Sequence, residues 1–310
     1  MKGKFSGLSA ISKLGIFILI IILSLVVIGI IGALIAGWIS GMSPTSPLIS
    51  DYSNPDTLLY MKTMQLFQSV GLFIVPPIIA AYLFNNSENN YLKLKLNNPF
   101  LIVISISMMV VAFPLINLLA EINQSMSLPE SMSGISNWMK ASETANNEIT
   151  KYFLQADSFG VFLFNLILIA LIPAIGEELL FRGIVQRLFS EMSKNIHIGI
   201  WVSAFLFSAV HMQFFTFLPR FLMGAMFGYF LIWSNSLSLT IAAHFVNNGL
   251  AVLINYLIQK GSIDASIETW GTNNIWASLI SAIILFGGFY FIHKKKNQLY
   301  QKSIIRIVNP

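Results

Sequence analysis

The sequence contains a succession of apolar segments that are each about long enough to cross a bilayer as a helix. A transmembrane helix takes roughly 20 apolar residues, because each helical residue advances ~1.5 Å across a hydrocarbon layer of ~30 Å. We predict an all-α fold, a polytopic membrane bundle of about eight transmembrane helices. The apolar segments are 14–39, 64–84, 100–120, 159–190, 196–215, 217–234, 237–258 and 275–292.

The composition excludes several other classes of protein. Hydrophobic residues make up 55% of the chain, charged residues only 10%, and the mean hydropathy is +0.73, which is not the composition of a soluble domain. The chain has 0 cysteines, so disulfides, thiolate metal sites and thiol nucleophiles are absent, and His, Asp and Glu are the candidate metal ligands. The net charge of +5 does not indicate a nucleic-acid partner, because the basic residues lie in short clusters beside the apolar segments.

The distribution of Lys and Arg predicts the orientation of the chain, since cytoplasmic loops are enriched in these residues. The segment 14–39 is too long for a signal-peptide core, so we expect it to be retained as the first helix. With eight spans and both termini in the cytoplasm, 13 of the 18 Lys and Arg residues lie inside and 5 outside. The stretch 121–158, predicted to be an outer loop, sums to −3. We expect an integral protein of the cell membrane.

The chain reads as a single membrane domain, 1–310. We predict peripheral helices and an outer loop over 1–158, a catalytic core over 159–258, and a last helix with a basic cytoplasmic tail over 259–310. The polar groups that suggest chemistry all fall in the middle segment.

The first polar cluster is Glu177, Glu178 and Arg182. In a helix, Glu178 and Arg182 are four residues apart and meet on one face, whereas Glu177 points about 100° away. Glu178 and Arg182 therefore suit a buried ion pair. Glu177 lacks that partner, and a carboxylate in a dry setting is a capable proton acceptor. An ordinary charged helix end facing the cytosol is the structural alternative.

The second cluster is Phe207 with His211, at the end of an apolar run. We expect His211 to lie on a helix, roughly 20 Å below the cytoplasmic surface. Glu177 reaches the same depth if its own helix continues well past Glu178, so the two side chains can meet. A satisfied interhelical hydrogen bond is the alternative role for such a histidine.

The third cluster is His244 with Asn248, which share one helical face a turn apart. Two such groups could stabilise an oxyanion, or His244 could ligate a metal while Asn248 orients the substrate. Hydrogen bonding between helices is the structural alternative. Between the second and third clusters, the pair Gly224 and Gly228 predicts close packing of helices, and Pro173 predicts a bend in the helix of Glu177.

The ordered set Glu-Glu-x-x-x-Arg, Phe-x-x-x-His and His-x-x-x-Asn resembles the CAAX prenyl protease and bacteriocin-processing family of intramembrane proteases, also called the type II CAAX protease or abortive-infection family. The resemblance covers about 159–258 and implies a helical membrane core. It implies that Glu177 and His211 activate the attacking water, directly or through a bound metal. It further implies that His244 and Asn248 steady the tetrahedral intermediate or complete the metal set, with Glu178 and Arg182 in support.

These residues leave the type of protease open. One divalent metal, with zinc the first choice, could be held by Glu177, His211 and His244, or the enzyme could be a metal-free glutamate protease. The expected partners are membrane lipid and a peptide or protein substrate, with a lipidated protein as one option. A membrane transporter, or a non-catalytic scaffold or immunity protein, is the alternative function for the same buried polar groups.

Overall fold

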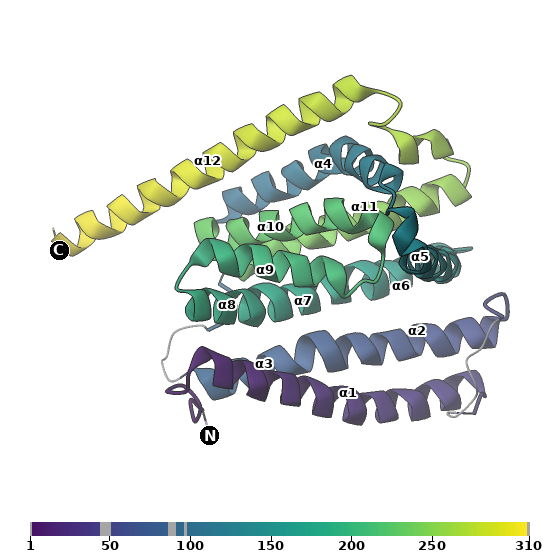
Figure 1. Cartoon of the computed structure of the whole chain (residues 1–310), viewed down its shortest axis with the longest axis horizontal. Coiled ribbons are helices and arrows are strands. Elements are labelled where there is room, and N and C mark those ends of the chain that lie inside the picture. The colour runs from purple at the N-terminus through teal and green to yellow at the C-terminus, as the bar shows by residue number, and fades with distance from the viewer. Residues whose placement is uncertain (1, 44–50, 86–90, 96–97, 309–310) are drawn as a thin grey trace.

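The computed structural model describes residues 2–43, 51–85, 91–95 and 98–308, with side chains as far as residue 295. All regular elements in these residues are helices, which confirms the predicted fold class (Figure 1). The long helices outside the centre are α1 (Ala10–Ser40), α2 (Pro55–Ser69), α3 (Val75–Phe84), α4 (Pro99–Ser125), α5 (Ser133–Leu154) and α12 (Ile275–Val308).

The central helices follow α5 in the chain. They are α6 (Phe159–Asn165), α7 (Ile172–Glu177), α8 (Gln186–Ser193), α9 (Ile196–Ala209), α10 (Phe217–Ser234) and α11 (Leu237–Gln259). Three π-helical stretches join shorter pieces into longer rods: η1 (Val70–Ile74) links α2 to α3, η3 (Leu166–Leu171) links α6 to α7, and η4 (Glu178–Val185) links α7 to α8. Short 3-10 turns lie at η2 (Glu130–Met132), η5 (Phe214–Thr216) and η6 (Ala265–Thr269).

Seven helices in the described part of the chain are long and apolar enough to cross a membrane, so this is an integral membrane protein. They correspond to seven of the eight predicted segments. The eighth, α9, has only 14 residues and is about 21 Å long, which is shorter than the hydrocarbon layer. The predicted segment 196–215 therefore ends early, at Ala209.

Two of the rods change from π- to α-helical geometry beside a proline. The stretch η1 precedes Pro76 and Pro77 in α3, and η3 precedes Pro173 in α7. A proline has no N–H and crowds the preceding turn, and a wider turn accommodates this irregularity. The second rod nevertheless runs as one span of 35 residues, Phe159–Ser193, as Glu177 requires in order to lie at membrane depth.

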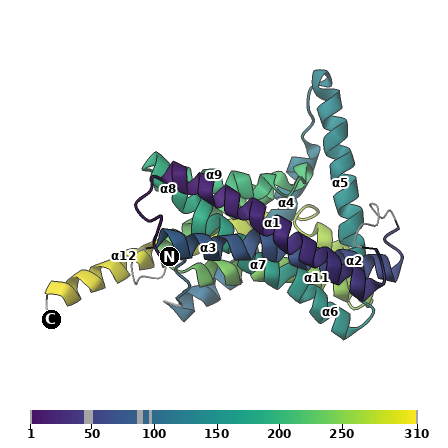
Figure 2. The ribbon, with the colours of Figure 1, turned by 90° about the horizontal axis from the view of Figure 1, so that it is seen from below.

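The stretch 121–158 differs from the predicted polar loop. Its first residues extend α4 as far as Ser125, and most of the rest forms the helix α5. In Figure 2, α5 projects away from the bundle, across the direction of the spanning helices. Polar residues separate the apolar ones on this helix at a helical rather than a loop-like spacing, which hydropathy averaged over the stretch conceals.

The start of α1 and the end of α12 lie at the same end of the bundle (Figure 1). We call it the terminal end. The segment 91–95, the connection from α8 to α9 and the connection from α10 to α11 also lie there. The opposite end carries α5 and the connection from α9 to α10.

Gly224 and Gly228 bring α10 close to α9 and α8, as predicted. A Cβ at Gly224 would lie 3.1 Å from the Cα of Ala204, and one at Gly228 would lie 2.8 Å from both a side-chain methyl of Ile200 and Oε1 of Gln186. Within a bilayer the hydrophobic effect does not drive helices together, because the lipid tails are as apolar as the side chains. Membrane helices therefore gain packing energy from the close approach of their backbones at small residues. This contact fixes the surroundings of Arg182 described below.

Candidate active site

The two glutamates lie at the junction of α7 and η4, in the middle of the protein. Glu177 is 7% exposed and Glu178 is fully buried. The preceding Gly176 allows this junction to approach η1, because a Cβ there would lie 2.6 Å from the Cβ of Phe73. The chain thus places two carboxyl groups at a point where apolar neighbours exclude water, which is costly unless the groups have partners.

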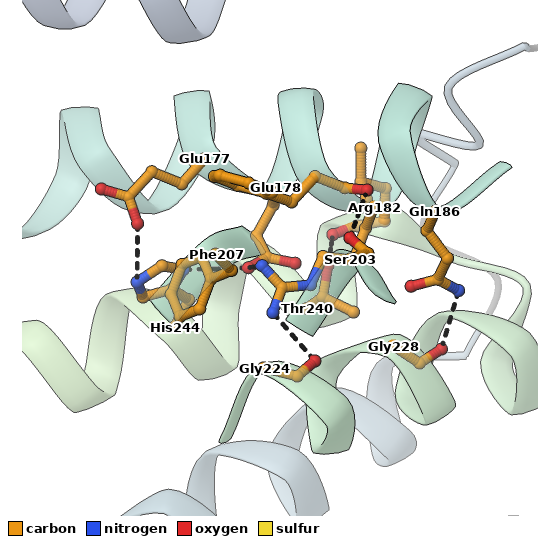
Figure 3. Close-up of polar contacts among 12 residues, drawn as sticks. Glu177, Glu178, Arg182, Gln186, Ser203, Phe207, Gly224, Gly228, Thr240 and His244 are labelled. Atoms are coloured by element: carbon orange, nitrogen blue, oxygen red, sulfur yellow. Dashed lines mark hydrogen bonds and ion pairs between the residues drawn. The ribbon is translucent and has the colours of Figure 1, made fainter. Parts of the chain in front are cut away.

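Glu178 has two partners. Its Oε1 lies 2.8 Å from Nη1 of Arg182, which confirms the predicted ion pair, and 2.9 Å from Nδ1 of His244. The contact with Arg182 is electrostatic rather than a well-aligned hydrogen bond, since Nη1 has no hydrogen-bond partner in the described structure. Glu178 therefore connects the first polar cluster to the third (Figure 3).

Arg182 is held on all sides. Its Nη2 donates to the carbonyl of Gly224 at 2.9 Å, and its guanidinium lies over the rings of Phe207 and Phe227, 4.5 and 5.3 Å from their centroids. The carbonyl of Gly224 is accessible because this residue has no side chain. These contacts assign Arg182 to the support of the site, since its guanidinium is paired with Glu178 and bonded to the carbonyl of Gly224.

His244 lies on α11 and is 3% exposed. Its ring stacks on Phe227 and meets Phe207 edge-on, with centroid distances of 5.2 and 5.6 Å. Glu178, paired with Arg182, accepts the hydrogen on Nδ1, so the neutral ring presents a lone pair on Nε2. That nitrogen lies 3.7 Å from Oε2 of Glu177.

His211 does not lie on a helix, and the prediction was wrong on this point. The helix α9 ends at Ala209, and His211 belongs to the turn that follows, where Met212 has a φ of 54°. Nδ1 of His211 lies 2.7 Å from the carbonyl oxygen of Phe207, so the ring caps the end of its own helix. A carbonyl can only accept, so the neutral ring carries its hydrogen on Nδ1 and has a lone pair on Nε2.

The predicted meeting of Glu177 and His211 at one depth is confirmed. Nε2 of His211 lies 3.9 Å from Oε2 of Glu177, and this oxygen is buried with no hydrogen-bond partner among the described residues. Glu177 therefore faces both histidines rather than His211 alone. Oε2 of Glu177 thus lies 3.9 and 3.7 Å from imidazole nitrogens of two other elements.

Asn248 lies outside this convergence. It is on α11, one turn after His244, and the hydrogen bonds of the described residues connect its side chain only to Asn247, whose Nδ2 donates to Oδ1 of Asn248 at 3.1 Å. The Nδ2 group of Asn248 is left as a donor. The structure brings together five of the six predicted residues and places the sixth beside them along α11.

Arg220 belongs to none of the three polar clusters and is a further candidate that their motifs do not indicate. Its Nη2 donates to Oε1 of Gln213 at 2.6 Å and to Oγ1 of Thr216 at 3.2 Å, while its Nη1 is buried without a hydrogen-bond partner in the described chain. It lies near enough to act electrostatically on Glu177 and His211. The signal was available, since an arginine inside an apolar segment usually marks function.

The projecting helix α5 supports the turn that carries His211. Ser142 and Asn146 both donate to the carbonyl oxygen of Met212, at 3.1 and 3.5 Å, and the ring of Trp138 packs on Phe214 with a centroid distance of 5.1 Å. Nothing in the sequence of 121–158 indicated this contact. It links the part of the chain outside the core to the position of a candidate catalytic histidine.

The donor atoms of the site suit a cation in their chemistry, since three lone pairs from one carboxylate and two imidazoles face one another. The described residues contain no group of three or more His, Cys, Asp or Glu side chains that could hold a metal ion. Metal binding by Glu177, His211 and His244 stays a prediction, and the chemistry proposed here uses only the chain's own side chains.

The fold and the site define a class of protein: a helical integral membrane protein with a buried carboxylate and two imidazoles at membrane depth. Residues 159–250 match the family described as type II CAAX prenyl endopeptidase Rce1-like, so this segment of the chain is similar to that family. The resemblance predicted from the three motifs is thereby confirmed.

The chain is also similar to an uncharacterized protein of Bacillus subtilis (strain 168), YpbD. The two are 29% identical over 86 residues, which are 26% of this chain and 41% of YpbD. The chain therefore spans less than half the length of this relative. No solved structure matches the chain.

Proposed function

We propose that this protein is an intramembrane endopeptidase that hydrolyses a peptide bond with a water molecule activated by Glu177. The observation that supports this most strongly is the convergence of Oε2 of Glu177 with Nε2 of His211 and Nε2 of His244, at 3.9 and 3.7 Å. These three atoms are all hydrogen-bond acceptors, so they cannot bond to one another unless a hydrogen lies between them. Separations above 3.5 Å are those that a water molecule bridges, and a water supplies two hydrogens.

Glu177 acts as the general base in this proposal. It takes a proton from the water while the water oxygen attacks the carbonyl carbon of the substrate, forming a tetrahedral intermediate with a negatively charged oxygen. His211 holds the water through its Nε2 lone pair. The proton on Glu177 then passes to the nitrogen of the scissile bond, the C–N bond breaks, and a carboxylic acid and an amine leave.

The negative charge on the intermediate requires donors or cations beside it. Asn248 offers its Nδ2 group, which has no acceptor among the described residues, one turn along α11 from His244, and Glu178 holds the ring of His244 in place. Arg220 adds a fixed cation with an unpartnered Nη1. We assign Asn248 and Arg220 to charge stabilisation, and Glu178 and Arg182 to holding His244 in place.

Zinc or another divalent metal stays a separate prediction from the family resemblance. Bound by Glu177, His211 and His244, it would supply a Lewis acid for the same reaction. The substrate class that fits a site at membrane depth is a peptide or protein segment at the membrane, and a lipidated protein is the option that the family description suggests.

We further propose that the protein lies in the cell membrane with both termini in the cytoplasm. The terminal end carries Lys93, Lys95 and Lys194 in its connecting segments, whereas the stretch 121–158, which includes α5 with two lysines and two glutamates, sums to −3. This distribution is the one expected from the preference of Lys and Arg for the cytoplasmic side.

The proposed function is tested by cleavage of a reporter polypeptide in reconstituted vesicles. We expect Glu177→Gln, His211→Ala and His244→Ala each to lower the cleavage rate by at least about a hundredfold, the usual contribution of general acid–base catalysis. Glu148→Gln, on the exposed face of α5, is the matched control and should cleave at the wild-type rate. Wild-type rates in all three site variants, with normal insertion, would rule out a protease of this mechanism.

A further inference from the structure

A second site lies at the terminal end of the bundle, in a cavity of about 360 Å³. Its walls come from the segment 91–95, from η4 and α8, and from the adjoining ends of α9 and α10. Arg182, which also supports the active site, is one of the residues that line it. The volume is within the range that small-ligand sites occupy.

The segment 91–95, which forms one side of the cavity, is held in place by packing and by hydrogen bonds to its backbone. Leu92 is buried against Gly183, where a Cβ would lie 2.8 Å from the Cδ2 of Leu92. The carbonyl groups of the segment accept hydrogen bonds from the start of α11: Leu237 N to Lys93 O at 2.9 Å, Ser238 Oγ to Leu94 O at 2.7 Å, and Ser236 Oγ to Lys95 O at 2.8 Å.

The cavity has an excess of positive charge. Arg187 forms an ion pair with Glu191 at 3.0 Å and stacks on the ring of Tyr91, with its CZ atom 3.8 Å from the centroid. Lys93 has no carboxylate at ion-pair distance in the part of the chain that the structure describes. Burial, and then the charge of Arg187, lower the pKa of Lys93, so its ammonium group gains from a bound anion.

Besides Arg182, two residues that line this cavity each carry a buried polar atom with no hydrogen-bond partner within the described residues. One is the hydroxyl of Tyr91, and the other is Oε1 of Gln186. Gln186 is only 2% exposed, and its Nε2 donates to the carbonyl of Gly228 at 3.3 Å, which leaves Oε1 free to accept (Figure 3). A buried polar group without a hydrogen bond raises the free energy of the folded protein. A ligand that forms the missing hydrogen bond removes this cost, and its binding is strengthened accordingly.

We propose that this cavity binds the phosphate group of an anionic ligand that also carries a hydroxyl. Lys93 and the Tyr91 hydroxyl donate to the phosphate oxygens, and Arg187 contributes charge beside them. Gln186 accepts the hydrogen of the ligand hydroxyl. Burial raises the pKa of Tyr91, so its hydroxyl keeps the hydrogen that it donates.

The position of the cavity favours a lipid headgroup as the source of that phosphate. It lies where the spanning helices end, and Ile196, Leu231 and Ile232 give it an apolar side suited to the ester region of a lipid. Phosphatidylglycerol has the required chemistry, a phosphodiester next to free hydroxyls. Inorganic phosphate offers the same anion without the apolar part.

The test compares these two sources by their effect on thermal unfolding in a neutral maltoside detergent. Purified full-length protein is titrated with dihexanoyl phosphatidylglycerol, and separately with inorganic phosphate at constant ionic strength. We expect the unfolding temperature to rise saturably as the ligand is added. Lys93→Gln should raise the half-saturating concentration by about tenfold or more, because a charged hydrogen bond to the ligand is lost. Lys95→Gln, an exposed lysine of the same segment, is the matched control and should bind as the wild type does.

A saturable rise with the lipid that Lys93→Gln weakens and Lys95→Gln preserves supports a lipid site, and the same pattern with inorganic phosphate supports a site for a soluble phosphate. Tyr91→Phe removes a single hydroxyl and should weaken binding even if Lys93→Gln fails to fold. No saturable rise with either probe, or equal weakening by Lys95→Gln, overturns the proposal.

Discussion

Replacing Arg182 with alanine should strongly destabilise the protein, because it leaves Glu178 charged and buried. The side chains of these two residues are 1% and 0% exposed. Removing one member of a buried ion pair costs about 3 to 5 kcal/mol, and the lost hydrogen bond to the carbonyl of Gly224 adds about 1 kcal/mol. Because His244 still contacts Glu178, we expect a net loss of about 3 to 5 kcal/mol in the free energy of unfolding.

The assay is equilibrium unfolding in mixed detergent micelles, with helicity as the signal. Arg187→Ala is the matched control: it breaks an ion pair of the same spacing whose side chains are 41% and 37% exposed, and should cost less than about 1 kcal/mol. The double variant Glu178→Gln with Arg182→Met should regain most of the stability, because no charge is then stranded. Equal stability of Arg182→Ala and Arg187→Ala would show that the buried pair of Glu178 with Arg182 contributes no more to stability than the exposed pair does.

Three further perturbations test the packing, the missed arginine and the metal. Gly228→Ala places a methyl 2.8 Å from Ile200 and should cost about 1 to 3 kcal/mol, whereas Gly29→Ala, with nothing within 4 Å, should cost nothing measurable by the same unfolding assay. Arg220→Gln should lower kcat by about tenfold or more with little change in KM, and Arg220→Lys should recover part of it; unchanged kcat would remove Arg220 from charge stabilisation. If the side chains catalyse cleavage without a metal, the cleavage rate should be unchanged in the chelator 1,10-phenanthroline. Loss of activity in the chelator that added zinc restores would show that the enzyme needs a metal.

The sequence was sufficient for seven of the eight predicted spans and for the pairing of Glu178 with Arg182. Spans follow from the length of apolar segments, and the pair follows from a spacing within one helix, so both are local properties. The same local reasoning failed at His211. The apolar residues continue past Ala209 through Phe214 and Phe217, and no Gly or Pro marks the end of the helix before Pro219.

Distant contacts stabilise the turn that hydropathy could not predict. Met212 accepts hydrogen bonds from residues 66 and 70 positions earlier in the chain, and Asn123 of α4 accepts from the backbone N–H of Leu218, near the start of α10, at 2.7 Å. These contacts exist only when α4 and α5 are in place. A prediction made from residues 196–234 alone had no access to them.

The amino-acid pattern is enough to identify a helical membrane protein with its reactive groups in three clusters, because polar residues stand out within long apolar segments. Only the tertiary structure decided how those clusters combine. It places His244 on Glu178 and turns both imidazoles toward Glu177, because side-chain direction at a junction of three elements depends on how the helices pack. It also brings Arg220 from the edge of its segment to the side of the site, since electrostatic proximity across helices has no counterpart in sequence spacing.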